Sequence, residues 1–189
     1  PENEGLPDGV TEAFAAGLSE RELVAALFLA GLRRFTFGDP AGEGMHVVYA
    51  THAAHELSLR SPPTERMDLL LWATERYEAA RRNEGEPARE LLPAADLELP
   101  AADDAEAAYL DAMDGWDEEA ADRAALALHR TDPARFWHRS LVFSCRNLGY
   151  AWHHGIFGRH AVGMLPMLRA QDADAVARRL WALLVDGWV

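Results

Sequence analysis

Apolar residues recur every three or four positions along most of this chain, and no segment alternates apolar and polar residues as a half-buried strand would. The run that contains Leu23, Leu27 and Leu32 is typical. No Asn-Gly pair marks a tight hairpin. The pattern therefore predicts an all-α fold of about seven helices. A chain of 189 residues is long enough to bury one sizeable core, so we expect a single helical domain over residues 1–189.

Local signals set most of the expected helix limits. Ser19 and Glu22 have the spacing of a capping box, and Asp132 followed by Pro133 is typical of a helix start. Residues 1–10 lack periodicity and are expected to form a loose arm, while Gly149 to Gly158 is expected to be a turn. Helical spacing follows Ser19 over about residues 23–32 and recurs over about residues 45–59, 65–82, 104–116, 118–129, 133–148 and 159–168. A last helix is capped by Asp172 or Asp174 and ends at Leu184 or Val185, so the segments number eight, close to the rough count of seven.

The chain shows a pseudo-repeat on either side of a proline-rich connector at residues 83–104. The pentad Gly44 to Val48 resembles Gly158 to Val162, and each is followed by a Leu-Trp-Ala triplet, around Trp72 and Trp181. These matches predict a pseudo-two-fold duplication of a three-helix unit, about residues 19–82 and 133–187, in which each pentad opens a helix. Chance agreement among common residues is the alternative interpretation.

Charge and cysteine content narrow the classes of partner. The formal net charge of −13 argues against nucleic acid and anionic membranes, because binding phosphates requires a concentrated basic surface. The single cysteine, Cys145, excludes an intrachain disulfide, and its apolar neighbours predict a buried thiol. We expect a cytoplasmic protein that acts on a small molecule, because no signal-like or membrane-spanning segment is seen; its oligomeric state is left open.

Histidines gather in two short segments, and imidazole is both a common metal ligand and a common acid or base near neutral pH. Asp39, Glu43 or Glu56 could complete a mononuclear site with them. Iron is favoured because the chain is rich in carboxylates and lacks thiolate pairs, with zinc and copper as alternatives. Catalytic residues are not identified by any motif. The candidate metal ligands are His46, His52, His55, His154 and His160.

Helical geometry limits which of these imidazoles can converge. His52 and His55 are three residues apart and share a helix face, whereas His46 and His55 lie on opposite sides of a straight helix. The order His-Glu-x-x-His is absent. Glu43 and His46 have the spacing of a di-iron motif, but the position that matches Glu43 before His160 is Phe157, which argues against a symmetric carboxylate-bridged centre.

Aromatic residues near the second histidine segment predict an apolar substrate pocket. Trp152, Tyr150 and Arg146 are its candidate residues, Arg146 as the partner of an anionic group. Trp72 and Trp181 lie on helical stripes and are expected in the core.

Together these features predict a metal-dependent enzyme that acts on a small, partly apolar molecule, by oxidation rather than hydrolysis. The alternative is a non-catalytic helical domain that binds a ligand or another protein. A third alternative is a haem held by one histidine.

Overall fold

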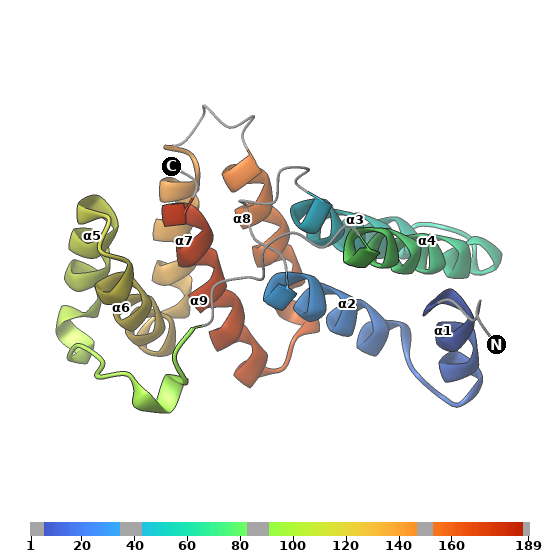
Figure 1. The fold of residues 1–189 in the computed structure, drawn as a ribbon, viewed down its shortest axis with the longest axis horizontal. Coiled ribbons are helices and arrows are strands. Elements are labelled where there is room, and N and C mark those ends of the chain that lie inside the picture. The colour runs from blue at the N-terminus through green and yellow to red at the C-terminus, as the bar shows by residue number, and fades with distance from the viewer. Residues whose placement is uncertain (1–5, 35–42, 83–90, 147–152, 187–189) are drawn as a thin grey trace. The chain divides into compact units, whose positions relative to one another are not determined.

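The computed structural model describes residues 6–34, 43–82, 91–146 and 153–186, and every regular element within them is helical. Figure 1 shows these helices in chain order. The all-α prediction is confirmed. The described residues contain nine α-helices, more than the seven or so expected. None of these helices has the length and the apolar run that a membrane span needs.

The chain divides into two compact units, Pro1–Ala88 and Arg89–Val189. In the first unit α3 packs between α2 and α4, and α1 packs on α4. Close contact between α2 and α3 is possible because Gly31 has no side chain; a Cβ there would lie 3.2 Å from Cγ1 of Val47. The helices of this unit are α1 (Leu6–Ala15), α2 (Glu20–Arg34), α3 (Glu43–Ser58) and α4 (Pro63–Arg82).

The capping box that starts α2 is confirmed. The Ser19 backbone N–H and hydroxyl both donate to Oε2 of Glu22, at 2.9 and 2.6 Å, and the Glu22 N–H donates back to the Ser19 hydroxyl at 3.3 Å. These bonds to Ser19 hold the pKa of the Glu22 carboxyl below its usual value. A local signal thus determines where this helix begins.

The expectation of a loose N-terminal arm is wrong for residues 6–10, which belong to α1. Val10 is buried, and α1 packs on α4. The Leu-Pro-Asp-Gly stretch carries turn-like residues, but a proline is accepted in the first turn of a helix. The packing on α4, which the local sequence does not reveal, supplies the apolar contact that stabilises the helix.

In the second unit α6 is the central helix, in contact with α5, α7 and α9. Nearly every side chain from Ala121 to His129 is buried, because small alanines let neighbouring helices approach on several sides. The α8 helix packs on α7 and α9. The elements of this unit are η1 (Ala94–Asp96), η2 (Ala102–Asp104), α5 (Ala105–Gly115), α6 (Glu118–Thr131), α7 (Pro133–Ser144), α8 (His153–Met164), η3 (Leu165–Met167) and α9 (Ala170–Asp186).

The predicted start of α7 is confirmed. Asp132 accepts a hydrogen bond from the Arg135 N–H at 3.0 Å, and Pro133 occupies the first turn. The predicted turn over residues 149–158 is wrong in its second half, because α8 begins at His153. Consequently the Gly158 pentad lies inside a helix instead of opening one, and Gly44 is the second residue of α3. The duplication stays a prediction.

Two further burial predictions are wrong and one is confirmed. Trp72 is exposed, since the buried side of α4 is formed by residues such as Leu70, Ala73 and Thr74, and Cys145, just after the end of α7, is exposed too. Trp181 is buried in α9, as expected. Its indole N–H donates to Oδ1 of Asp122 at 3.0 Å, and the Arg178 guanidinium binds the same carboxylate from α9.

Candidate functional site

The predicted metal ligands of α3 have different environments. His46 is exposed, with its ring 6.0 Å from that of Tyr49, whereas His52 and His55 are buried. The expected division of His46 and His55 between opposite sides of the helix is therefore observed. His52 Nε2 lies 4.0 Å from the Glu56 carboxylate. The buried Nδ1 of His55 has no hydrogen-bond partner among the described residues.

The other predicted ligands lie on α8 in the second unit. His154 is buried and His160 is partly exposed. Across the described ranges, no three His, Cys, Asp or Glu side chains are placed so that they could hold one metal ion. Asp39, Tyr150 and Trp152 lie outside the described residues. The metal site consequently stays a prediction.

An apolar hollow of the second unit lies at the carboxyl ends of α5, α7 and α9, with a volume of about 200 Å³. It is large enough for one ring, since an engineered apolar cavity of about 150 Å³ takes up benzene. Of the predicted pocket residues, Arg146 lies at this hollow. We call it the Trp116 pocket; its described lining is Met113, Trp116, Phe143, Arg146 and Leu184.

Trp116 is held in a backbone conformation that favours glycine. Its φ is 57°, the one positive φ among the described residues other than glycine. This left-handed conformation costs an ordinary residue about 1–2 kcal/mol. The reversal after Gly115 lets Asp117 cap α6 by accepting from the Ala120 N–H at 3.0 Å. Strained residues of this kind gather at functional sites, and this one places a partly exposed indole beside the hollow.

Arg146 supplies the charge at the pocket. Its guanidinium lies over the Phe143 ring, 4.1 Å from the centroid, in a cation–π contact. It also donates to the carboxylate of Asp114 on α5. Both partners of this ion pair are more than half exposed, and exposed pairs of this kind contribute only about 0–1 kcal/mol. A ligand can therefore compete for Arg146.

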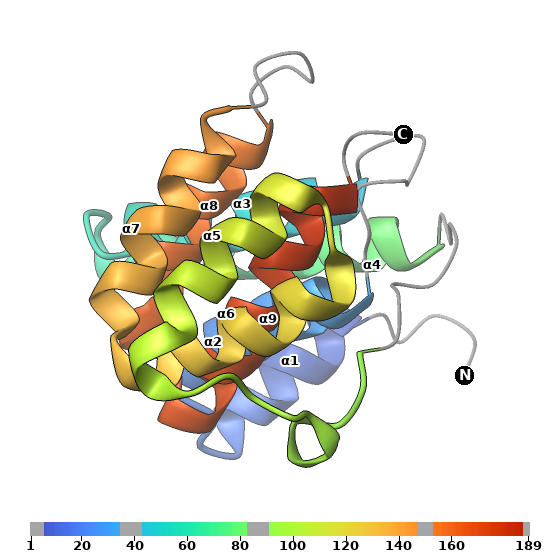
Figure 2. The same cartoon turned by 90° about the vertical axis from the view of Figure 1, so that its left-hand side faces the viewer.

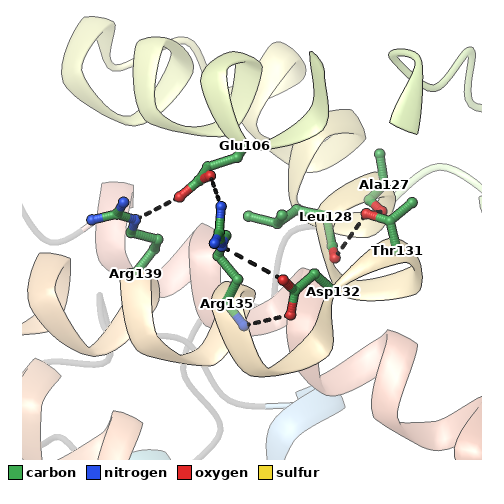
Figure 3. A network of polar contacts seen from close by, with 7 residues as sticks. All are labelled: Glu106, Ala127, Leu128, Thr131, Asp132, Arg135 and Arg139. Atoms are coloured by element: carbon green, nitrogen blue, oxygen red, sulfur yellow. Dashed lines mark hydrogen bonds and ion pairs between the residues drawn. The ribbon is translucent and has the colours of Figure 1, made fainter. Parts of the chain in front are cut away.

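Side-chain contacts between α5 and α7 hold the pocket walls in place. Arg135 and Arg139 on α7 both donate to Glu106 near the start of α5, at 2.6 and 2.9 Å (Figure 3). In the buried layer the Tyr109 hydroxyl and Ser140 share a hydrogen bond of 3.0 Å. With the Asp114–Arg146 pair at the other end, these contacts align two parallel helices, which lie side by side in Figure 2.

A second, wider hollow of about 400 Å³ lies beside the first turns of α7. Asp132, Ala134, Arg135, His138 and Arg139 line it. The charges of Asp132, Arg135 and Arg139 already pair with one another and with Glu106 (Figure 3). This hollow lacks an apolar wall of the kind that Trp116 and Phe143 provide, and the Trp116 pocket is the stronger candidate for a ligand.

The Glu106 contacts predict acid-sensitive stability. Hydrogen bonds from Arg135 and Arg139 hold the pKa of the Glu106 carboxyl below its usual value. The unfolded chain then binds more protons in acid, so this stabilisation is complete above about pH 5 and is lost as the pH falls through the folded-state pKa. We expect Glu106→Gln to flatten the rise in urea midpoint between about pH 3 and 5. Glu98→Gln is the control, since Glu98 is exposed in the connector. Equal pH profiles for the two variants would contradict the expectation.

Arg146 was singled out from the sequence for a pocket with Tyr150 and Trp152, which stays a prediction, and the other residues that line the Trp116 pocket were not singled out for a pocket. Met113, Phe143 and Leu184 resemble ordinary core residues in the sequence, and the packing of three helices brings them together. The Gly115-Trp116-Asp117 break between two helices was the available signal, since a large aromatic residue at a helix end is costly unless it packs or binds.

Comparisons with family models, with curated proteins and with solved structures give no match to this chain.

Proposed function

We propose that the second unit is a binding module that takes an apolar group, such as a single aromatic ring, into the Trp116 pocket. The observation that supports this is the strained Trp116 beside a hollow with apolar walls. The left-handed turn also serves the cap of α6, and it places the indole where a ligand in the hollow could contact it. This function is the binding alternative of the sequence interpretation.

Indole is a suitable probe because it has the size of the hollow and a face to stack on Trp116. A ligand of about ten non-hydrogen atoms gains about 0.4–0.5 kcal/mol per atom, which corresponds to a Kd near 1 mM. We expect saturable binding in a ligand-observed NMR titration. Trp116→Asn should weaken it at least tenfold, because asparagine accepts the left-handed backbone but removes the indole wall.

Trp72→Gln is the matched control for this titration. Trp72 and Trp116 are both 46% exposed, but Trp72 belongs to α4 of the first unit. Glutamine suits a helix interior, so the fold of α4 should be kept. Indole binding that is unsaturable, or that both variants weaken equally, would overturn the proposed function.

A metal-dependent enzyme is the second candidate, favoured by the buried Nδ1 of His55 and by the buried His52 one turn earlier on the same face of α3. A buried ring nitrogen without a hydrogen bond costs about 1–3 kcal/mol, and a bound ion would relieve that cost. The bound metal would be iron and the reaction an oxidation, with zinc or copper as alternatives.

Elemental analysis of the purified protein tests the metal candidate. We expect about one equivalent of metal, lost in His55→Ala. His138→Ala is the control because His138 is exposed on α7. A metal-free protein that takes up neither iron nor zinc on titration would exclude this candidate.

A further inference from the structure

The two charged groups beside the Trp116 pocket differ in how firmly they are held. Arg146 follows the last turn of α7, where the helix dipole favours a cation, and its guanidinium also lies over Phe143. Asp114 is in the last turn of α5, where the same dipole disfavours a carboxylate, and its hydrogen bond to Arg146 is the contact that holds it. Asp114 is therefore the partner that an incoming group would displace.

We infer that the natural ligand of this pocket carries an anionic group, which replaces Asp114 on Arg146 while the apolar part occupies the hollow. This inference rests on the proposed function and names its ligand class: a small carboxylate or phosphate ester with one ring or branched chain. The guanidinium offers a planar fork of N–H donors, a geometry that matches a carboxylate or phosphate. The volume of about 200 Å³ limits the apolar part to about one ring.

The net charge of −13 does not decide the sign of the ligand. At physiological ionic strength charges are screened over about 8 Å, so the group in direct contact determines the selectivity. That group is Arg146, at the pocket itself. A cationic ligand would instead have to displace Arg146, which is tethered to the chain and held by Phe143 and Asp114.

Three probes of one shape test this inference on the full chain: 3-phenylpropionate, 3-phenylpropanamide and 3-phenylpropylamine. We expect the carboxylate to bind about tenfold more tightly than the amide, and the amine to bind most weakly. The ratio of the Kd values of benzyl alcohol and benzyl phosphate gives the gain from a phosphate. Comparing it with the ratio for 3-phenylpropanamide and 3-phenylpropionate shows which anion the pocket prefers. Each Kd is measured by NMR titration at fixed ionic strength.

Variants at the ion pair separate charge recognition from ring binding. Arg146→Gln should remove the preference for 3-phenylpropionate over its amide, while binding of the amide changes less than threefold. Asp114→Asn should tighten the carboxylate about threefold by removing its competitor. Arg123→Gln is the control, since Arg123 pairs with exposed Glu119 on α6. If carboxylate and amide bind equally, or if the amine binds best, the inference is wrong although the proposed function stands. If none of the probes binds, the proposed function itself fails.

Discussion

Replacing Asp122 with alanine is expected to lower the free energy of unfolding by about 3–5 kcal/mol. Asp122 on α6 accepts from Nε of Arg178 at 2.7 Å and from Nε1 of Trp181 at 3.0 Å, both on α9. Asp122 and Arg178 are each only 7% exposed. Without the carboxylate, a buried guanidinium and a buried indole N–H both lose their acceptor, and an uncompensated buried charge is the costly part.

Urea unfolding followed by circular dichroism measures this loss, and amide hydrogen exchange in α6 and α9 locates it. Glu119→Ala is the matched control on the same helix, because its pair with Arg123 is exposed and should contribute less than about 1 kcal/mol. The double variant Asp122→Leu with Arg178→Met should recover the part of the loss that comes from the unpaired charge, since it removes both charges and leaves only the Trp181 indole N–H without its acceptor. A loss below about 1 kcal/mol in Asp122→Ala would show that the pair is hydrated in solution.

The fold class and several helix ends were predictable because their causes are local. Ser19 and Glu22 satisfy each other's backbone across one helical turn, and Asp132 with Pro133 starts α7 in the same way. These signals depend on residues three positions apart, so a single sequence contains all of the information. The all-α fold class was predictable for a related reason, because helical periodicity and the absence of strand-like alternation are also read from residues close in sequence.

What the sequence did not reveal depends on contacts between distant segments. α1 forms because it packs on α4, and the start of α8 was missed because Gly155 and Gly158 resemble helix breakers. In the structure Gly158 is instead a position of close helix contact. The exposure of Trp72 likewise depends on which face of α4 is buried, which periodicity alone does not determine.

Of the residues that line the Trp116 pocket, the sequence drew attention to Arg146 alone as a candidate for binding, for the same reason. An arginine near aromatic residues carries a chemical expectation by itself, whereas Met113 and Leu184 become pocket walls only when α5 and α9 are brought together. The ion pairs of Glu106 with Arg135 and Arg139 join residues about thirty positions apart. The histidines show the opposite relation, because residues that are close in sequence do not converge in the fold. Their two clusters do not bring three metal-binding side chains together among the described residues.

Gly158→Ala is expected to destabilise the protein by about 1–3 kcal/mol, although alanine is the better helix former. A Cβ at this position would lie 2.9 Å from the Ser144 hydroxyl oxygen and 3.2 Å from Cδ2 of Leu141. Ser144 cannot rotate away without cost, because its hydroxyl donates to the Ser140 carbonyl at 2.7 Å in a buried setting. The added methyl therefore forces α8 and α7 apart or breaks that hydrogen bond.

Gly155→Ala, one turn earlier on the same helix, separates this packing effect from helix propensity. Its Cβ would meet only the Ser144 carbonyl oxygen, at an ordinary distance of 3.9 Å. It should therefore stabilise α8 by up to about 1 kcal/mol. Adding Ser144→Ala to Gly158→Ala should recover part of the loss. The coupling between positions 144 and 158 follows from the urea midpoints of the parent protein, the two single variants and the double variant. If Gly158→Ala proves as stable as Gly155→Ala, the close contact between α7 and α8 is not maintained in solution, and Gly158 has no special role in their packing.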